Sequence, residues 1–162
     1  MSNNKQAWWQ GAKGEWYVLV QFILFAFIAF YSPDIGLNAW KQKLSFLYYP
    51  GLLITIFASI IVVLGLIHLG RNLSVFPHPK DDAQLVETGV YALIRHPIYG
   101  GLILLVTGYG LMTVNAILII YGFLLFVFFE FKTKREEKYL KLKFHGYASY
   151  QARVKKLIPF IY

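Results

Sequence analysis

Apolar residues are concentrated in three long stretches of the chain, and the polar residues lie between and after them. The first stretch covers residues 16–31, the second covers residues 47–67, and the third runs over residues 98–131. As one helix the third stretch would be about 50 Å long, much longer than the roughly 30 Å hydrocarbon core of a bilayer. It is therefore predicted to fold back on itself as a helical hairpin.

The bend of this hairpin is predicted near residues 112–116. Thr113 and Asn115 are poor residues for a helix interior, and two glycines shortly before them weaken the preceding turns. The alternative is one long span without a bend. With the hairpin, the pattern predicts an all-α fold, a polytopic membrane bundle of about four transmembrane helices, as a single domain over residues 1–162.

Composition supports this assignment to the membrane. Of the 162 residues, 57% are hydrophobic and 19% are aromatic, and the mean hydropathy is +0.51, which is too apolar for an ordinary soluble domain. The chain has no cysteine, so disulfides, thiolate zinc sites and cysteine nucleophiles are excluded. The formal charge of +8 lies beside the apolar stretches, where basic residues meet anionic lipid, so no nucleic-acid partner is expected.

The distribution of lysine and arginine predicts the orientation. With four spans, the N-terminal segment, the connection between the second and third spans, and the C-terminal tail share one side, and only Lys41 and Lys43 lie on the other. Both termini should therefore be cytoplasmic, in an inner or plasma membrane. The tail mixes apolar and charged residues over residues 130–144, which predicts a helix that leaves the membrane, and a second short amphipathic piece is expected before Pro159.

Polar side chains gather at the start of the third apolar stretch, in the segment VYALIRHPIYGG. Pro97 suits the first turn of a helix, whose free N–H groups and positive dipole end attract anions. Arg95 and His96 stand directly before it, and the paired carboxylates Glu136 and Glu137 lie on the tail at the same membrane face. This set suits a zwitterionic ligand, with its carboxylate at Arg95 or His96 and its ammonium or ribose hydroxyls at a glutamate.

Other polar and small residues have simpler interpretations. The four histidines show no Glu-x-x-His or His-x-x-x-His spacing, so no metal site is predicted. Glu130 lies at the end of the apolar stretch, where a carboxylate is costly unless it is paired or near the interface. The glycines of the apolar stretches predict close packing between helices.

The VYALIRHPIYGG segment belongs to a longer pattern, Gly-x-Tyr-x-x-x-Arg-His-Pro-x-Tyr-x-Gly, which this chain meets in full at Gly89, Tyr91, Arg95, His96, Pro97, Tyr99 and Gly101. Together with GRNLSVFPHPK before it and EFKTKREEKYLKLKF after it, this pattern resembles the membrane-embedded isoprenylcysteine carboxyl methyltransferases and their prokaryotic relatives, which are also similar to phospholipid methyltransferases. The resemblance covers about residues 70–160.

This resemblance implies methyl transfer from S-adenosylmethionine to a lipophilic acceptor at the cytoplasmic membrane face. The acceptor would be an isoprenylcysteine-like carboxylate, or a lipid amine or thiol. The implied cofactor-binding residues are Tyr91, His96, Tyr99 and Glu137, and the implied catalytic residues are Glu136, Lys132 and Arg95. The segment LIPF, residues 157–160, would help to cover the adenine.

Two departures from the family pattern concern the acceptor. Family members often have arginine where this chain has Lys132, and a lysine loses the bidentate grip on a carboxylate. Phe144 and His145 replace the usual Phe-Gly, with one residue fewer before Tyr147. A carboxylate acceptor needs no base, whereas a protonated amine or a thiol needs one, for which Glu136 is the best-placed group in the sequence.

Two other functions fit parts of the sequence. Membrane reductases of the sterol reductase type, which use NADPH, resemble this fold in their C-terminal part, although their cofactor usually needs a longer chain. The third interpretation is a non-catalytic membrane protein whose basic tail binds anionic lipid. Binding of S-adenosylmethionine, of a reduced nicotinamide nucleotide, or of neither separates the three.

Overall fold

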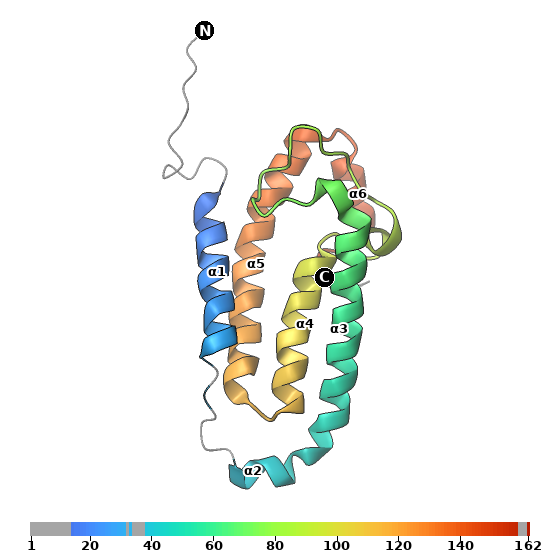
Figure 1. The fold of residues 1–162 in the computed structure, drawn as a ribbon. Helices are drawn as coiled ribbons and strands as arrows, with labels where there is room; N and C mark the ends of the chain where they lie inside the picture. The colour runs from blue at the N-terminus through green and yellow to red at the C-terminus, as the bar shows by residue number, and fades with distance from the viewer. Residues whose placement is uncertain (1–13, 32, 34–37, 159–161) are drawn as a thin grey trace.

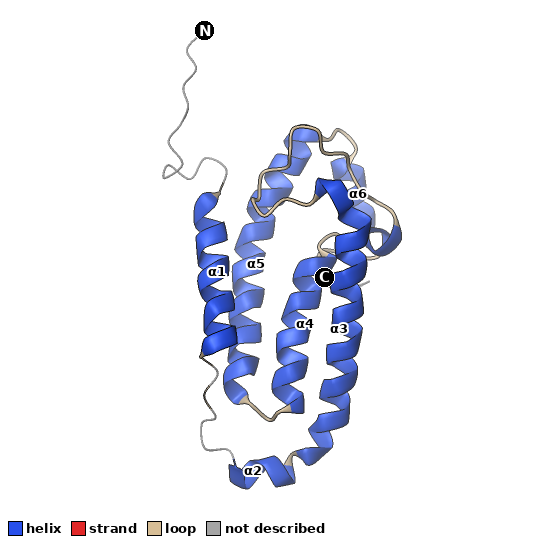
Figure 2. Cartoon of the chain, viewed as in Figure 1, coloured by secondary structure: helices blue, strands red, loops and turns tan. Residues whose placement is uncertain are grey.

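The computed structural model describes residues 14–31, 33, 38–158 and 162. Helices make up most of this part (Figure 2): α1 (Glu15–Phe30), α2 (Asn38–Lys43), α3 (Tyr48–Leu69), α4 (Pro97–Met112), α5 (Ala116–Lys143) and α6 (Tyr147–Arg153). Short 3₁₀ turns, η2 (Ser45–Leu47), η3 (Gly70–Asn72) and η4 (Gly89–Ala92), connect them. In these residues there is no β-strand, only an isolated parallel bridge between Ile94 and Lys155, and the predicted all-α fold is confirmed.

The four long helices lie side by side in the spatial order α1, α5, α4, α3 (Figure 1). α3 packs most extensively against α4, α4 packs against α5, and α1 contacts α5. The short helix α2 lies at one end of the bundle, and α6 lies at the other end, near the C-terminal end of α5 (Figure 1). The first and second apolar stretches of the sequence therefore lie on opposite sides of the α4–α5 hairpin.

Close packing of α3 on α4 depends on glycines in both helices. A Cβ atom at Gly101 would lie 2.6 Å from a methyl carbon of Val62, and a Cβ atom at Gly51 would overlap the backbone of Met112. Such short distances leave no room for a side chain, so the two backbones can approach each other only at glycine. The predicted packing role is confirmed for Gly101, and Gly51 has the same role.

The predicted hairpin between the last two apolar helices is also confirmed. α4 ends at Met112 and α5 begins at Ala116, as the predicted bend over residues 112–116 requires. The side chain of Asn115 caps α5 by accepting hydrogen bonds from the N–H groups of Ile117, at 3.0 Å, and Leu118, at 3.4 Å. A short polar side chain at this position satisfies N–H groups that the first turn of a helix leaves free.

The helix predicted over residues 130–144 is present and is the continuation of the last apolar helix. α5 continues without a break to Lys143, so its 28 residues form one helix about 42 Å long. The segment contains neither proline nor glycine before Gly146 and is rich in lysine, glutamate and leucine, which favour helix. The change from apolar to charged side chains alters the surroundings of the helix but not its backbone.

A long connection without regular structure, residues 73–88, runs from the end of α3 towards η4 and contacts the charged part of α5. Lys143 of α5 donates a hydrogen bond to the backbone carbonyl of Asp81 at 2.8 Å, and the ring of His78 lies 4.9 Å from the ring of Tyr139. These contacts hold the connection against the end of the bundle where the predicted site residues lie.

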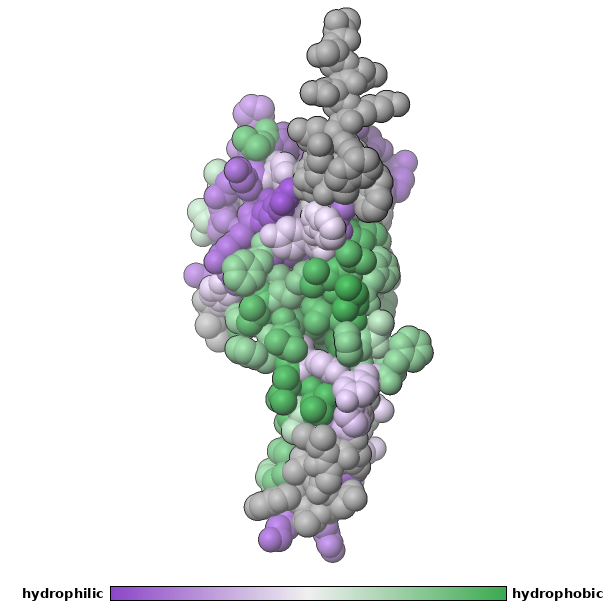
Figure 3. Space-filling view, turned by 90° about the vertical axis from the view of Figure 1, so that its left-hand side faces the viewer, coloured by the Kyte–Doolittle hydropathy of each residue, from purple (hydrophilic) through white to green (hydrophobic). Residues whose placement is uncertain are grey.

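The outer surface of the bundle is apolar. Figure 3 shows a broad hydrophobic zone over α1 and its neighbours, with hydrophilic residues gathered at the end that carries the charged part of α5. Two helical segments in the described part, Ser45–Asn72 and Ala116–Lys143, are long and apolar enough to cross a membrane, and α1 and α4 are shorter apolar helices. Exposed phenylalanines such as Phe22, Phe57 and Phe123 would be unfavourable in water, and lipid accommodates them.

Candidate active site

A partly enclosed cavity of about 210 Å³ lies where α4 begins and the charged part of α5 emerges from the apolar zone. Its wall is shared by α1, the 73–88 connection, the segment from η4 into α4, α5 and α6. Six of the seven predicted site residues line it, namely Tyr91, Arg95, His96, Tyr99, Lys132 and Glu136. The seventh, Glu137, is bonded to Arg95 and His96. The fold thus brings all seven together.

Glu137 is the centre of a buried polar network. Its Oε1 atom lies 2.9 Å from both Nε and Nη2 of Arg95 and 3.1 Å from Nε2 of His96. Its Oε2 atom accepts a hydrogen bond from the side-chain amide of Gln151 at 2.8 Å. Nη1 of Arg95 donates to the backbone carbonyls of Gln151 and Val154. Both carboxylate oxygens, and the donors of Arg95, are therefore engaged by protein groups.

This network changes the expected position of an anionic ligand. Arg95 and His96 were expected to attract the carboxylate of a zwitterion, but the carboxylate that meets them is Glu137 from α5. Arg95 joins the start of α4 to α5 and α6, which favours a role in shaping the site over direct contact with a reacting group. The assignments of Arg95 to catalysis and of Glu137 to cofactor binding stay predictions.

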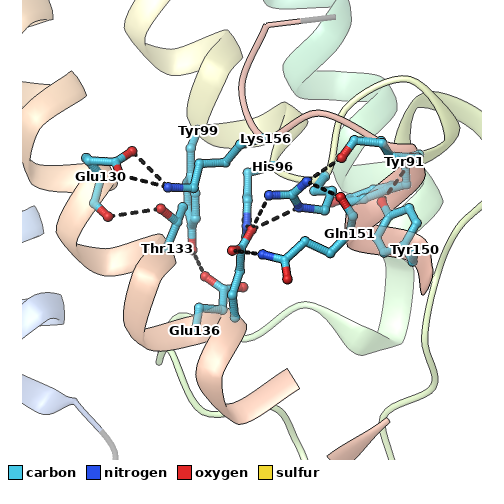
Figure 4. A network of polar contacts seen from close by, with 12 residues as sticks. Tyr91, His96, Tyr99, Glu130, Thr133, Glu136, Tyr150, Gln151 and Lys156 are labelled. Carbon is cyan, nitrogen blue, oxygen red and sulfur yellow. Dashed lines mark hydrogen bonds and ion pairs between the residues drawn. The ribbon is translucent and has the colours of Figure 1, made fainter. Parts of the chain in front are cut away.

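Tyr99 and Glu136 form the second polar pair in the cavity wall. The Tyr99 hydroxyl donates a hydrogen bond to Oε2 of Glu136 at 2.9 Å (Figure 4). The Tyr99 ring stacks between the ring of His96, at 5.5 Å between centroids, and the ring of Phe129, at 4.4 Å. Since Glu136 and Glu137 are adjacent on one helix, they point about 100° apart, and each meets a different part of the motif.

Lys132 brings a buried positive charge into the cavity. It is 1% exposed, and its ammonium group donates to Oε1 of Gln21 in α1 and to the backbone carbonyl of Val75, at 3.2 Å for the latter. The same ammonium lies 5.1 Å from the centroid of the Tyr99 ring, a distance at which a cation is attracted to an aromatic face. Within the described residues, its hydrogen bonds go to neutral oxygens and not to a carboxylate.

Tyr91 links the motif to the helices around it. Its hydroxyl donates to the backbone carbonyl of Gly65 in α3 at 3.3 Å, and its own carbonyl accepts from the hydroxyl of Tyr150 in α6 at 2.6 Å. Burial raises the pKa of Tyr91 and that of Tyr150 well above the ordinary tyrosine value, so both remain hydrogen-bond donors. Gly89 starts η4 with a φ of 62°, and the ring of His68 fills the space where a Cβ would stand.

The C-terminal residues 154–158, which we call the strap, cross the start of α4. The N–H groups of Arg95 and His96 donate to the carbonyls of Lys155, at 2.9 Å, and Lys156, at 3.0 Å. A Cβ atom at Gly100 would lie 2.9 Å from the carbonyl oxygen of Leu157, so glycine permits the close approach. The strap therefore supplies acceptors for two backbone N–H groups just before α4. From the sequence alone these N–H groups had no evident partner.

Glu130 is paired, as its position at the end of the apolar stretch required. Both of its carboxylate oxygens accept from the ammonium of Lys156 in the strap at 2.9 Å (Figure 4). The ammonium of Lys134 lies 3.4 Å from Oε1 of Glu130. The pair joins the strap to α5 beside the cavity. Pro159 and Phe160 of the segment expected to cover the adenine lie outside the described residues, and only Leu157 and Ile158 of that segment can be placed.

Three side-chain hydrogen bonds of the site were not predicted from the sequence. They join Gln21 to Lys132, Gln151 to Glu137, and Lys156 to Glu130. Gln21 is a single amide inside an otherwise apolar helix, and this signal could have been used. The described residues contain no group of three or more histidines, cysteines or carboxylates arranged to hold a metal ion.

Comparison with known proteins places this site in a family. Residues 51–142 match the Isoprenylcysteine carboxyl methyltransferase (ICMT) family, over more than half of the chain. The chain belongs to this family. The matched residues run from α3 through the charged part of α5 and include the 73–88 connection, the Arg-His-Pro-x-Tyr motif, Glu136 and Glu137.

Several curated members of the ICMT family are similar to this chain. It is 31% identical over 137 residues to the protein-S-isoprenylcysteine O-methyltransferase of Saccharomyces cerevisiae, covering 82% of this chain and 57% of the yeast protein. It is 31% identical over 121 residues to a probable protein-S-isoprenylcysteine O-methyltransferase of Oryza sativa subsp. indica, covering 72% and 63% of the two chains. It is 33% identical over 125 residues to the protein-S-isoprenylcysteine O-methyltransferase of Homo sapiens, covering 74% of this chain and 44% of the human protein. The chain thus matches less than two thirds of the length of these relatives.

Proposed function

We propose that this protein is an S-adenosylmethionine-dependent methyltransferase that methylates the carboxylate of a lipophilic, isoprenylcysteine-like acceptor at the membrane surface. The observation that carries the proposal is the convergence of the Arg-His-Pro-x-Tyr motif and Glu136 on one cavity at the polar end of an apolar bundle, with Glu137 bonded to His96 of the motif. The similarity to protein-S-isoprenylcysteine O-methyltransferases supports methyl transfer over the reductase and lipid-binding alternatives.

The residues of the cavity fit S-adenosylmethionine in chemical terms. The cofactor carries a carboxylate, an ammonium, a ribose and an adenine, and the wall offers the Lys132 ammonium, the Glu136 carboxylate, tyrosine hydroxyls and apolar surface. The cavity of about 210 Å³ is smaller than the 300 Å³ or more typical of ligand sites, so we expect the 73–88 connection to move outward when ligands bind.

The cofactor supplies an electrophilic methyl group when bound, and the protein must hold donor and acceptor close together and exclude water. Tyr99, fixed in the ring stack, would orient the ligand through its hydroxyl and through Glu136. Arg95 and Glu137 would keep the start of α4, α5 and α6 in register around it. Because a carboxylate acceptor is already nucleophilic, no proton transfer is needed in this step.

Lys132 is the group we assign to the acceptor carboxylate. Its ammonium faces the cavity from α5, beside α1, and neutral oxygens hold it in place. A lysine can attract a carboxylate as a point charge, without the bidentate geometry of an arginine. For an amine or a thiol acceptor, Glu136 would instead have to accept a proton, and it already accepts a hydrogen bond from Tyr99.

We infer that all four long helices lie in the membrane with both termini in the cytoplasm. α1 and α4 contain 16 residues each and would span about 24 Å, so they require local thinning of the bilayer or a position within the bundle. α4 meets the second condition because it lies between α3 and α5. The concentration of basic residues at the end that holds the cavity supports a cytoplasmic site.

Calorimetric titration of the detergent-solubilised protein tests the donor. S-adenosylhomocysteine, the product form of the proposed cofactor, should bind saturably, and a reduced nicotinamide nucleotide titrated in parallel should not. Binding of the nicotinamide nucleotide alone would replace the proposal by a reductase. Binding of neither would replace it by a lipid-binding role.

Two variants test the assignment of residues. Tyr99→Phe keeps the ring stack and removes only the hydroxyl on Glu136, so it should weaken S-adenosylhomocysteine binding without unfolding the protein. Glu136→Gln should reduce turnover more than binding. His96→Ala is a poorer test than the sequence suggested, because His96 is only 6% exposed and removal of its ring opens the packed interior. Unchanged affinity in Tyr99→Phe would contradict its role.

A further inference from the structure

Tyr147 places a hydroxyl in the cavity wall that no described residue satisfies. The residue is 1% exposed, it lines the cavity, and its hydroxyl has no hydrogen-bond partner among the described residues. A buried hydroxyl without a partner loses its hydrogen bonds to water and gains nothing in return. Such a group at a cavity wall is expected to meet its partner in a ligand.

Tyr150 provides a comparison within the same short helix. It is 2% exposed, so it is as buried as Tyr147, but its hydroxyl donates to the backbone carbonyl of Tyr91 at 2.6 Å. The two rings lie 5.8 Å apart, nearly perpendicular to each other. α6 therefore carries two buried tyrosines in similar surroundings. The hydroxyl of Tyr150 bonds within the fold, whereas that of Tyr147 has no partner among the described residues.

The charged groups around Tyr147 bond other partners and not its hydroxyl. Burial raises its pKa far above the ordinary tyrosine value, and the nearby carboxylate of Glu137 acts in the same direction, so the hydroxyl keeps its proton. Both oxygens of Glu137 already accept from Arg95, His96 and Gln151. The Tyr147 hydroxyl is thus a neutral donor that remains available to a ligand.

We propose that the hydroxyl of Tyr147 donates a hydrogen bond to S-adenosylmethionine and is a ligand-binding residue of this site. This inference rests on the proposed function. Tyr147 is assigned to the cofactor because its charged neighbours are Arg95 and Glu137. The acceptor is assigned to Lys132, which lies beside Gln21 of α1. The family motif at the start of α4 does not contain this residue; it comes from the C-terminal segment.

Tyr147→Phe is the test, with Tyr150→Phe as the matched control. For the full chain in detergent, the affinity for S-adenosylhomocysteine should fall about 5- to 15-fold in Tyr147→Phe, as expected for one lost hydrogen bond. The ligand-free melting temperature of this variant should equal or exceed that of the wild type, since an unsatisfied polar group has been removed. Tyr150→Phe, which loses a hydrogen bond of the fold, should melt at a lower temperature.

The outcomes separate this inference from the proposed function. If the wild type binds S-adenosylhomocysteine and Tyr147→Phe binds it equally well, the inference is wrong and the methyltransferase proposal stands. If the ligand-free Tyr147→Phe protein melts as far below the wild type as Tyr150→Phe does, the hydroxyl has a partner within the fold, and the inference is also wrong. If the wild type does not bind this ligand, both are wrong.

Discussion

Replacement of Glu137 by glutamine tests whether this carboxylate holds the site together. The substitution keeps the size of the side chain but removes the charge that faces Arg95 and His96. The glutamine amide also brings two N–H donors to a place where Arg95, His96 and Gln151 already donate. At least one of these donors must lose its acceptor in a region that water does not reach.

The cost can be estimated from the burial of the pair. The side chains of Arg95 and Glu137 are 8% and 9% exposed, so the pair is not screened by solvent. Loss of one partner from a buried pair costs about 3–5 kcal/mol of unfolding free energy. Glutamine keeps one carbonyl oxygen that can still accept a hydrogen bond, so the expected cost is at the lower end, about 3 kcal/mol. For a chain of this size, about 3 kcal/mol corresponds to a melting temperature roughly 6–12 °C lower.

Thermal unfolding of the ligand-free protein in detergent is the assay, with Glu136→Gln as the control. Glu136 is the neighbouring residue and accepts one side-chain hydrogen bond, from Tyr99, so the same substitution should lower the melting temperature by only about 2–4 °C. If Glu137→Gln melts no lower than Glu136→Gln, the buried network does not stabilise the fold as reasoned here. A second test is a double-mutant cycle with Arg95→Gln, which should show coupling above about 1 kcal/mol.

Three further predictions concern packing, pH and the strap. Gly51→Ala should lower the free energy of unfolding by about 1–3 kcal/mol because its Cβ would overlap the α4 backbone. Gly146→Ala, whose Cβ would meet only one atom at 3.9 Å, is the control and should unfold like the wild type. Equal melting temperatures of the two variants would contradict the packing argument. The contribution of the buried tyrosines to stability should be constant up to about pH 10 and fall above it by up to about 1.4 kcal/mol per pH unit for each tyrosine whose pKa is raised by burial. An unchanged melting temperature between pH 10 and pH 11 would refute this. These tyrosines are Tyr91, Tyr147 and Tyr150. Lys156→Met should release the strap and increase proteolysis at the C-terminus, while Lys134→Met, which removes a more exposed partner of Glu130, should not; identical digestion patterns would count against the ion pair.

Local features of the sequence were sufficient for the elements of this fold. The α4–α5 hairpin follows from the length of the apolar stretch and from Asn115, whose side chain caps the helix that begins one residue later. Proline at the first position of α4 and the packing glycines are likewise local signals. The mixed apolar and charged segment over residues 130–144 predicted a helix, and because nothing between residues 130 and 143 interrupts the backbone hydrogen bonds, this helix is the continuation of the apolar one.

The partners of the polar site residues were decided by the tertiary structure alone. The sequence brought Arg95 and His96 together with two glutamates, but whether these two side chains meet a ligand or Glu137 depends on how α5 is rotated against α4. Gln21 reaches Lys132 only because α1 packs against α5 and not against α3, the next long helix in the sequence. Helices and caps form through contacts within a few residues, whereas these polar pairs join segments 14 to 111 residues apart, and only the packing of helix on helix sets such distances.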